Sequence, residues 1–322
     1  MDGPSIDVFR EVKAAESRIR PYIRQTYLEP SSYFSEISGA NIFFKCENLQ
    51  HTGSFKARGA MNKLLSLKSA ELEKGVVTAS TGNHGAAVAF ALSQLEANGI
   101  VFVPSHAASS KVEAIKRLGA EVRYYGTDSV EAEAYARQYA RDQGLTFISP
   151  YNDSQIIGGQ GTIGIELARQ LEHIDAVFIA LGGGGMISGI AGYLKRLRSD
   201  CRIIGCSPAN SQVMIQSIKA GEILDLPSQP TLSDGTSGGV EPGSITFPLC
   251  QELVDGYETV TEEEIKRWLR QYLFSHHMLI EGSAAVPIAA MLKRSDELQG
   301  QNVIIVLCGA NIDLETLTEI LG

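Results

Sequence analysis

The sequence lacks an excess of basic residues, a long apolar run and paired cysteines. Its 28 Lys and Arg residues are outnumbered by 37 Asp and Glu residues, which gives a formal net charge of −9 over 322 residues. Nucleic-acid backbones and anionic membrane surfaces attract basic proteins, so this charge argues against both as partners. The apolar runs, such as residues 302–308, are far too short to span a bilayer.

The cysteines give no sign of a cross-linked or metal-bound framework. They are odd in number and contain no CxxC pair, at positions 46, 201, 206, 250 and 308. This spacing fits neither a disulfide framework nor a zinc site, and most of the thiols are expected to be buried small apolar groups. The first residues, Met1 to Ser17, hold early acidic residues and no apolar segment of signal-peptide length. We therefore expect a soluble cytoplasmic protein.

Short β-branched runs alternate with helical patterns through almost the whole chain. This alternation predicts the α/β class, with parallel sheets covered by helices, and the length favours two domains or one large one. Strands are expected at 42–46, 76–79, 100–103, 122–125, 176–181, 202–206 and 303–307. Helices are expected at 86–95, 111–118, 130–142, 161–171 and 185–197, with another capped by Thr261. Residues 227–248, rich in Gly, Ser, Thr and Pro, predict a long loop beside a site.

Four consecutive glycines, Gly182 to Gly185, separate a predicted strand from the helix that begins near Met186. Without side chains, the N–H groups of such a turn can point at a ligand, and a helix N-terminus favours a phosphate. The alternative is a tight turn, which would need only one or two glycines. The patterns GxGxxG and GxxxxGK[ST] are absent from this turn, so the nicotinamide and nucleoside-triphosphate interpretations lose their usual support.

Two further polar turns are candidates for chemistry. Lys56 falls in the first turn of a helix expected to start near Ser54, where the positive helix end should lower the pKa of its amine. By itself, an exposed lysine is the simpler interpretation. Ser80-Thr-Gly-Asn-His-Gly85 also joins a strand to a helix, and its polar groups can surround a carboxylate. The alternative there is an ordinary helix capped by Ser80 or Thr81.

In this order and spacing, the motifs resemble the fold-type II (tryptophan synthase β-like) family of pyridoxal 5′-phosphate (PLP) enzymes. The resemblance is to its serine/threonine dehydratase (threonine ammonia-lyase) and serine racemase branch. It covers residues from about 7 to 313, and the matching segments are 52–59, 80–85, 158–162, 182–186 and 308–311. The resemblance implies two domains, each with a largely parallel twisted sheet flanked by helices. Residues 1–69 with 149–322 would form the large PLP-binding domain and residues 70–148 a small mobile one, in a homodimer.

The same resemblance implies roles for individual residues. Lys56 forms the Schiff base with PLP, beside Phe55, and later removes the α-proton of the substrate. The phosphate is held by Gly182, Gly183, Gly184, Gly185 and Met186. The substrate carboxylate is held by Ser80, Thr81, Gly82, Asn83 and His84, and Asn83 also bonds the 3′-oxygen of the ring.

Cys308 falls where the family places a serine or cysteine against the pyridine nitrogen. A thiol there leaves the nitrogen largely unprotonated, which favours β-elimination over chemistry that needs a long-lived carbanion. The alternative is a buried thiol at the end of a strand.

Two positions depart from the family pattern. Thr81 stands where racemases of the branch have a serine that donates a proton on the face opposite the lysine. Its hydroxyl makes it a candidate catalytic residue, although on a stiffer β-branched side chain. The segment Gly205 to Val213 lies where the branch often binds a divalent cation, but both carboxylates of that pattern are missing, so no metal is expected.

The implied reaction is a β-elimination that converts L-threonine to 2-oxobutanoate, or L-serine to pyruvate, with release of ammonia. The sequence ends shortly after Asp313, which favours a short catabolic type without a regulatory domain. The alternatives are a serine or aspartate racemase and a 3-hydroxyaspartate ammonia-lyase, in which Arg58 or residues 237–239 would face a second carboxylate. A more distant alternative is a non-catalytic PLP-binding protein.

Overall fold

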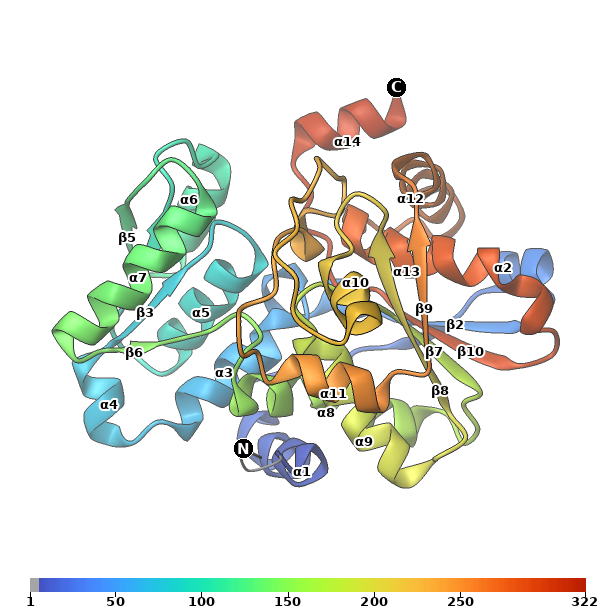
Figure 1. Ribbon diagram of the computed structural model, residues 1–322, viewed down its shortest axis with the longest axis horizontal. Coiled ribbons are helices and arrows are strands. Elements are labelled where there is room, and N and C mark those ends of the chain that lie inside the picture. The colour runs from blue at the N-terminus through green and yellow to red at the C-terminus, as the bar shows by residue number, and fades with distance from the viewer. Residues whose placement is uncertain (1–5) are drawn as a thin grey trace.

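The computed structural model describes residues 6–322 and contains two units, each built on its own sheet (Figure 1). Residues 1–5, where the predicted large domain starts, lie outside the described residues. The larger sheet has the order β1 (Leu28–Pro30), β2 (Asn41–Lys45), β10 (Asn302–Val306), β7 (Ala176–Ala180), β8 (Arg202–Pro208) and β9 (Gly256–Val260). The smaller sheet has the order β5 (Glu121–Tyr124), β4 (Gly99–Val103), β3 (Val76–Ala79) and β6 (Thr146–Phe147).

Neighbouring strands of both sheets run parallel, apart from β1, which is antiparallel to β2. The central strand β7 is buried along its whole length and consists of apolar residues only, as expected for a parallel strand covered on both faces. Each predicted strand agrees with the structure to within two residues at each end. The predicted α/β class is therefore confirmed.

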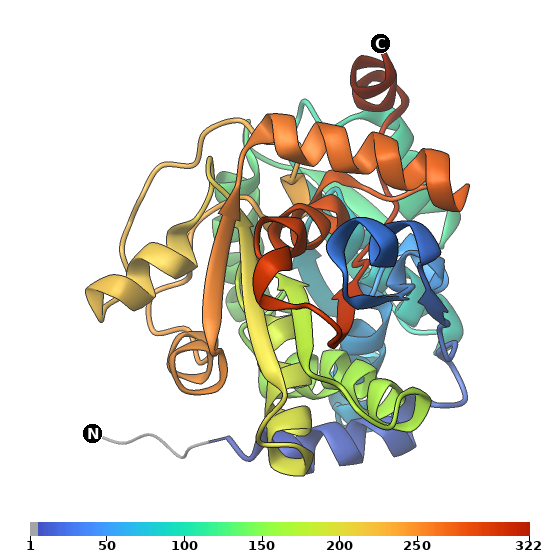
Figure 2. The same ribbon diagram turned by 90° about the vertical axis from the view of Figure 1, so that its right-hand side faces the viewer.

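The helices around the larger sheet form a layer on each face. Their bounds are α1 (Val8–Ile19), α2 (Ser32–Ser38), α3 (Lys56–Ser66), α8 (Ser154–Gln170), α9 (Gly185–Leu197), α10 (Val213–Ala220), α11 (Thr246–Leu253), α12 (Glu262–His276), α13 (Gly282–Lys293) and α14 (Leu314–Leu321). Helices α13 and α9 both pack on β7 and β8, from opposite faces, with α12 outside α13 and with α8 and α1 against α9 (Figure 2). The predicted cap of α12 is confirmed, since Thr261 Oγ1 accepts a hydrogen bond from the Glu264 N–H at 3.2 Å.

The smaller sheet is accompanied by α4 (Ser69–Lys74), α5 (Asn83–Gln94), α6 (Ser109–Arg117) and α7 (Ser129–Gln143) (Figure 1). Four 3-10 turns complete the structure: η1 (Glu47–Leu49), η2 (His51–Gly53), η3 (Asp234–Thr236) and η4 (Ser295–Glu297). Helix α3 joins the two units because it packs on both α8 and α5. The domain boundaries at 69/70 and 148/149, and the mobility of the smaller unit, stay predictions.

Helix α8 begins at Ser154, well before the predicted start at Gly161. The glycines at 158, 159 and 161 weaken a helical pattern in the sequence, but here they let other chain segments approach closely. A Cβ on Gly159 would lie 2.6 Å from the Arg58 carbonyl oxygen, and one on Gly161 would lie 2.7 Å from that of Gly189. The segment 158–162 therefore serves helix packing behind the site.

The described residues give little sign of a membrane segment or of cross-links. Within residues 6–322, no helix is both long and apolar enough to cross a membrane. All five cysteines are buried and free, as expected for small apolar side chains.

A buried network of charges ties α3 to its neighbours. The Arg58 guanidinium lies 2.8 Å from a Glu47 oxygen and 2.7 Å from a Glu166 oxygen, and Lys45 Nζ lies 2.6 Å from the other Glu166 oxygen. All four side chains are fully buried. The prediction that Arg58 could face a second substrate carboxylate is wrong, because its guanidinium is already occupied by two buried carboxylates.

We predict that Glu166→Gln destabilises the protein strongly. Burial alone would raise the pKa of Glu166, but Arg58 and Lys45 outweigh it and lower this pKa to about 2. Removing the carboxylate leaves buried cations without enough partners, which typically costs about 3–5 kcal/mol. The measurement is the urea midpoint at pH 7. The matched control is Glu113→Gln, which removes an exposed ion pair with Lys116 and should shift stability by less than about 0.5 kcal/mol. A similarly small shift for Glu166→Gln would contradict the assigned role of the network.

Candidate active site

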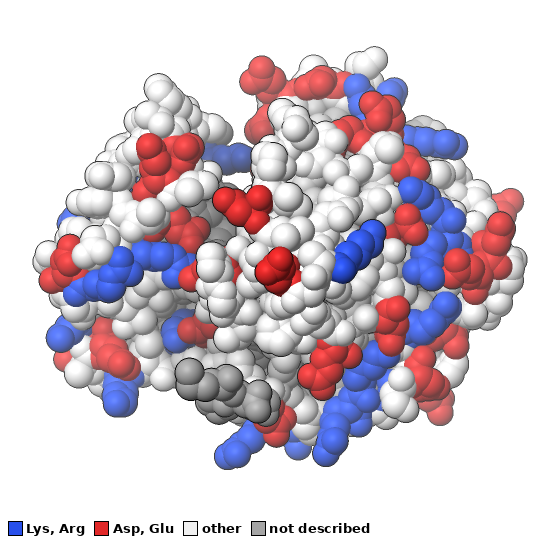
Figure 3. Space-filling view, viewed as in Figure 1, with Lys and Arg blue, Asp and Glu red and all other residues white. Residues whose placement is uncertain are grey.

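A cavity of about 1270 Å³ lies between the two units, at the carboxyl ends of strands from both sheets. Figure 3 shows the surface hollowed between the two lobes. Ligands of open parallel sheets bind at this edge because the loops that leave the strands converge there. Apart from Arg58, the structure brings the residues predicted to bind the cofactor and the substrate to this cavity, and these are Phe55, Lys56, Ser80, Thr81, Gly82, Asn83, His84, Gly182, Gly183, Gly184, Gly185, Met186 and Cys308.

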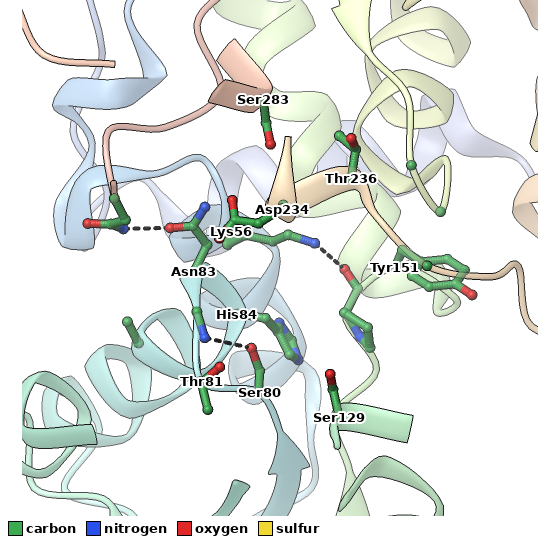
Figure 4. Close-up of a pocket in the computed structure, with 18 of the residues that line it drawn as sticks. Lys56, Ser80, Thr81, Asn83, His84, Ser129, Tyr151, Asp234, Thr236 and Ser283 are labelled. Atoms are coloured by element: carbon green, nitrogen blue, oxygen red, sulfur yellow. Dashed lines mark hydrogen bonds between the residues drawn. The ribbon is translucent and has the colours of Figure 1, made fainter. Parts of the chain in front are cut away.

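Lys56 is the first residue of α3, as the sequence predicted to within a turn, and its side chain reaches into the cavity. Nζ donates a hydrogen bond to the Pro150 carbonyl oxygen at 2.9 Å and lies 5.2 Å from the centre of the Phe55 ring. Figure 4 shows the amine between Asn83 and Tyr151. Burial lowers the pKa of Lys56 to about 8, against the opposing effect of Cys308 and Glu281. The expected lowering is present, but burial is its largest cause.

The glycine loop leads from β7 into α9, which starts at Gly185. Gly184 has a φ of +85°, which is strained for any residue with a side chain. A Cβ on Gly183 would lie 2.4 Å from the Tyr151 ring, whose hydroxyl accepts a hydrogen bond from the Glu241 N–H at 2.8 Å. The loop therefore has a shape that only glycines allow, and it presents the N-terminus of a long helix to the cavity, as a phosphate site requires.

The turn from Ser80 to His84 leads from β3 into α5 on the other side of the cavity. The cap of α5 is Gly82, and no side chain caps the helix. Ser80 Oγ instead accepts a hydrogen bond from the Gly82 N–H at 3.2 Å. The alternative of a helix capped by Ser80 or Thr81 is therefore wrong, and the N–H groups of the first turn stay available for an anion.

The His84 ring is neutral at physiological pH. Its pKa is lowered to about 3 by burial and by the nearby Lys56. Nε2 lies 3.0 Å from the Ile148 carbonyl oxygen, so the single ring hydrogen of the neutral form is on Nε2 and bonds that oxygen. The ring therefore has no hydrogen left for a substrate carboxylate.

Asn83 and Cys308 meet at Glu281, which the sequence prediction did not include. Asn83 Nδ2 lies 3.0 Å from both Glu281 carboxyl oxygens, and Cys308 Sγ lies 3.7 Å from one of them. Burial raises the pKa of Glu281 to about 7. Burial also raises the pKa of the Cys308 thiol, with Glu281 adding to the effect, so the sulfur keeps its proton.

Tyr151, Glu281 and Ser283 also line the cavity but were missed. The available signal for the last two was an acidic residue followed by Gly-Ser and the apolar run 284–292, the start of a mostly apolar helix. Residues 234–241 line the cavity as well, which confirms the prediction of a long loop beside a site.

The segment 205–213 holds hydroxyl groups in place of carboxylates. Ser207 Oγ donates a hydrogen bond to the Leu181 carbonyl oxygen at 2.7 Å, directly before the glycine loop. In the described part of the chain, no three His, Cys, Asp or Glu side chains are grouped as metal ligands. That the protein needs no metal stays a prediction.

The arrangement fits an aldehyde cofactor that carries a phosphate. It supplies an amine with a lowered pKa, a glycine cradle without space for side chains, and a protonated thiol in one cavity. The first turn of α5 offers a second anion site to a substrate carboxylate.

We predict that Gly183→Ala weakens PLP binding about tenfold or more, since the new methyl group would displace the hydrogen-bonded Tyr151 ring from the loop. The measurement is the PLP dissociation constant of the cofactor-free protein from an absorbance titration. The matched control is Gly239→Ala, at another cavity-lining glycine, where a Cβ meets nothing within 4 Å. Equal affinities for the two variants would contradict the steric argument.

The pKa of Lys56 predicts the pH dependence of reconstitution. Only the neutral amine attacks the PLP aldehyde, so the rate of colour formation should rise with pH and level off above about 8. The reference is N-acetyl-lysine, whose amine titrates near its ordinary pKa of about 10.4 and whose rate should keep rising beyond pH 9. A protein rate that still rises steeply between about pH 9 and 10 would show that burial does not lower this pKa.

Known proteins resemble this chain over almost its full length. The family described as pyridoxal-phosphate dependent enzyme matches residues 19–309. An L-threonine ammonia-lyase of Geobacter sulfurreducens is 41% identical, with 95% of this chain and 76% of the relative covered. A catabolic L-threonine dehydratase of Escherichia coli (strain K12) is 38% identical, with 97% and 95% covered. The crystal structure of serine racemase from Dictyostelium discoideum has a TM-score of 0.89 and 37% identity, with 95% and 99% covered. The chain therefore belongs to the fold-type II family of pyridoxal-phosphate-dependent enzymes, and its cofactor is pyridoxal 5′-phosphate.

Proposed function

We propose that the protein is an ammonia-lyase of the catabolic type that eliminates water and ammonia from L-threonine, L-serine or both. The single observation that carries this proposal is the position of Lys56, whose buried amine shares one cavity with the uncapped start of α5. The names of two relatives, an L-threonine ammonia-lyase and a catabolic L-threonine dehydratase, support the same substrate class.

Lys56 is the proposed general base. PLP, when bound, takes up the negative charge that develops at the α-carbon as the proton leaves. The Lys56 amine, once free, removes that proton, and a pKa of about 8 keeps a useful fraction of the amine neutral near pH 7. By resemblance, Cys308 faces the pyridine nitrogen of PLP. Its protonated thiol adds no charge there. This favours elimination, in which the negative charge is passed on at once to the departing hydroxyl.

The substrate carboxylate is proposed to bind at the first turn of α5. Thr81 and the N–H groups of Asn83 and His84 offer hydrogen-bond donors beside Ser80, and the helix end favours an anion. The neutral His84 ring lines the cavity and donates its hydrogen bond to the Ile148 carbonyl oxygen. Only the backbone N–H of His84 is therefore proposed to contact the carboxylate. The cofactor phosphate, which the glycine loop would hold, or another nearby acid would supply the proton that the departing β-hydroxyl needs.

Serine racemisation is the second candidate. Its support is the Thr81 hydroxyl, which lines the cavity on the α5 side, together with the similarity to a serine racemase. A 3-hydroxyaspartate or aspartate substrate has less support. Arg58 is occupied, and Lys111 and Arg137 at the cavity are paired with Asp234 and Glu241.

The two ion pairs also bear on the proposed movement of the smaller unit. Lys111–Asp234 at 3.4 Å and Arg137–Glu241 at 3.0 Å connect helices α6 and α7 to the loop 234–241 of the larger unit. Such partly exposed pairs contribute little stability, so they are compatible with opening and closing of residues 70–148 around the substrate. A homodimer in the cytoplasm remains part of the proposal.

The deciding experiment is a panel of the L- and D-forms of serine, threonine and 3-hydroxyaspartate, with oxo-acid release and chiral inversion measured separately. L-Threonine and L-serine should release oxo acid, and addition of EDTA should leave the rates unchanged because the cation-binding carboxylates are missing.

The control is Lys56→Ala, which should lose both activity and the absorbance at about 410 nm that borohydride bleaches in the parent protein. Inversion of L-serine that is faster than elimination would replace the lyase proposal with the racemase. A coloured protein that acts on none of these amino acids would favour the non-catalytic alternative.

A further inference from the structure

Glu281 is a buried carboxylate whose described partners are all uncharged. Its side chain is 2% exposed at the N-terminus of α13. Within residues 6–322, its oxygens accept hydrogen bonds from the Asn83 amide at 3.0 Å, the Asn311 N–H at 3.1 Å and the Cys308 thiol at 3.7 Å. Burial of a carboxyl whose hydrogen-bond partners are all uncharged is costly, and the hydrogen bonds offset part of that cost.

The partners of Glu281 come from both units of the protein. Asn83 is the first residue of α5 beside the smaller sheet, whereas Cys308 and Asn311 follow β10 in the larger one. Asn311 Nδ2 also donates hydrogen bonds to Asn83 Oδ1 at 2.5 Å and to the Thr52 carbonyl oxygen at 2.7 Å. The Asn83 amide thus has one orientation, with its oxygen toward Asn311 and its nitrogen toward Glu281.

We propose that Glu281 is a positioning residue that holds Asn83 and Cys308, one from each unit, around the PLP ring. The inference rests on the cofactor site of the proposed function but not on the amino acid that is turned over. As a carboxylate, Glu281 accepts from Asn83 and Cys308 at the same time. When protonated, one of its oxygens becomes a donor, which cannot face the Asn83 amide nitrogen and leaves part of the network unsatisfied.

Charged groups from several elements act on Glu281. Lys56 on α3 favours the ionised carboxylate and is itself affected by it, while Asp234 in η3 favours the protonated form. The Asn83 amide, the Asn311 N–H and the Cys308 thiol also stabilise the ionised form by hydrogen bonds. Burial opposes them and places the titration near pH 7. The ring environment should therefore change in the neutral pH range.

The test uses the holoenzyme and compares Glu281→Gln, Glu281→Asp and the control Glu262→Gln. Glu262 also accepts a backbone hydrogen bond, from the Leu232 N–H at 2.7 Å, but lies outside the cavity. The readouts are the absorbance of bound PLP between about pH 5 and 9 and the PLP dissociation constant of the cofactor-free protein. Both need PLP but no substrate, so they succeed or fail independently of the substrate panel.

Glu281→Gln should abolish the absorbance change near neutral pH and weaken PLP binding about tenfold, the effect of losing a hydrogen bond to a charged group. Glu281→Asp keeps the charge but is one methylene shorter, so the absorbance change should persist while binding still weakens. The control should match the parent protein. If Glu281→Gln does not fold, as judged by circular dichroism, Glu281→Asp carries the test, and unchanged PLP binding in it overturns the proposal.

A double-mutant cycle separates positioning from a general loss of structure. Because Glu281 acts partly through Asn83, the loss of PLP binding free energy in the double variant Glu281→Gln/Asn83→Ala should be smaller than the sum of the two single losses. Additive losses would overturn the proposal. So would a Glu281→Gln protein that keeps the parent absorbance profile and binds PLP within about twofold of the parent.

Discussion

The buried ion network behind Lys56 is the constraint on which the site depends. Arg58 follows Lys56 by two residues on α3, and its guanidinium bonds Glu47 in η1 and Glu166 on α8. Lys45 at the end of β2 completes the network through Glu166. Because each buried charge needs its partner, these elements fit together in one arrangement. That arrangement places the first turn of α3, and with it Lys56, at the cavity.

The glycines of α8 allow this arrangement to form. The helix passes so close to α3 that a side chain at Gly159 would collide with the Arg58 backbone. Glu166 lies farther along the same helix and can then reach both Lys45 and Arg58. The close packing of α8 on α3 and the pairing of the buried charges therefore depend on each other. None of the residues involved lines the cavity.

Burial has one consistent effect inside the cavity, which is to favour neutral side chains. It lowers the pKa values of Lys56 and His84 and raises those of Glu281 and Cys308. A neutral amine is the nucleophile that an aldehyde cofactor needs. The anionic groups of a ligand can instead bind at two helix N-termini, those of α9 and α5. There, backbone N–H groups attract an anion without a charged side chain. The cavity is thus suited to a phosphate on one side and a carboxylate on the other.

The sequence by itself determined the class of fold and most of the site. β-Branched runs located seven of the ten described strands to within two residues, since a parallel strand buried on both faces has to be apolar, whereas β1, β6 and β9 were not predicted. The glycine loop, Lys56 and the turn at 80–85 could be found as candidates because each depends on a few consecutive residues, and their order and spacing together carried the family resemblance. Only the tertiary structure decided the start of α8 and the roles of Arg58, Tyr151 and Glu281. Arg58 and Glu166 are 108 residues apart, and Asn83 and Glu281 are 198 apart. A charged residue looks the same in a sequence whether it faces solvent, substrate or a buried partner, and only the packing of distant segments makes that choice.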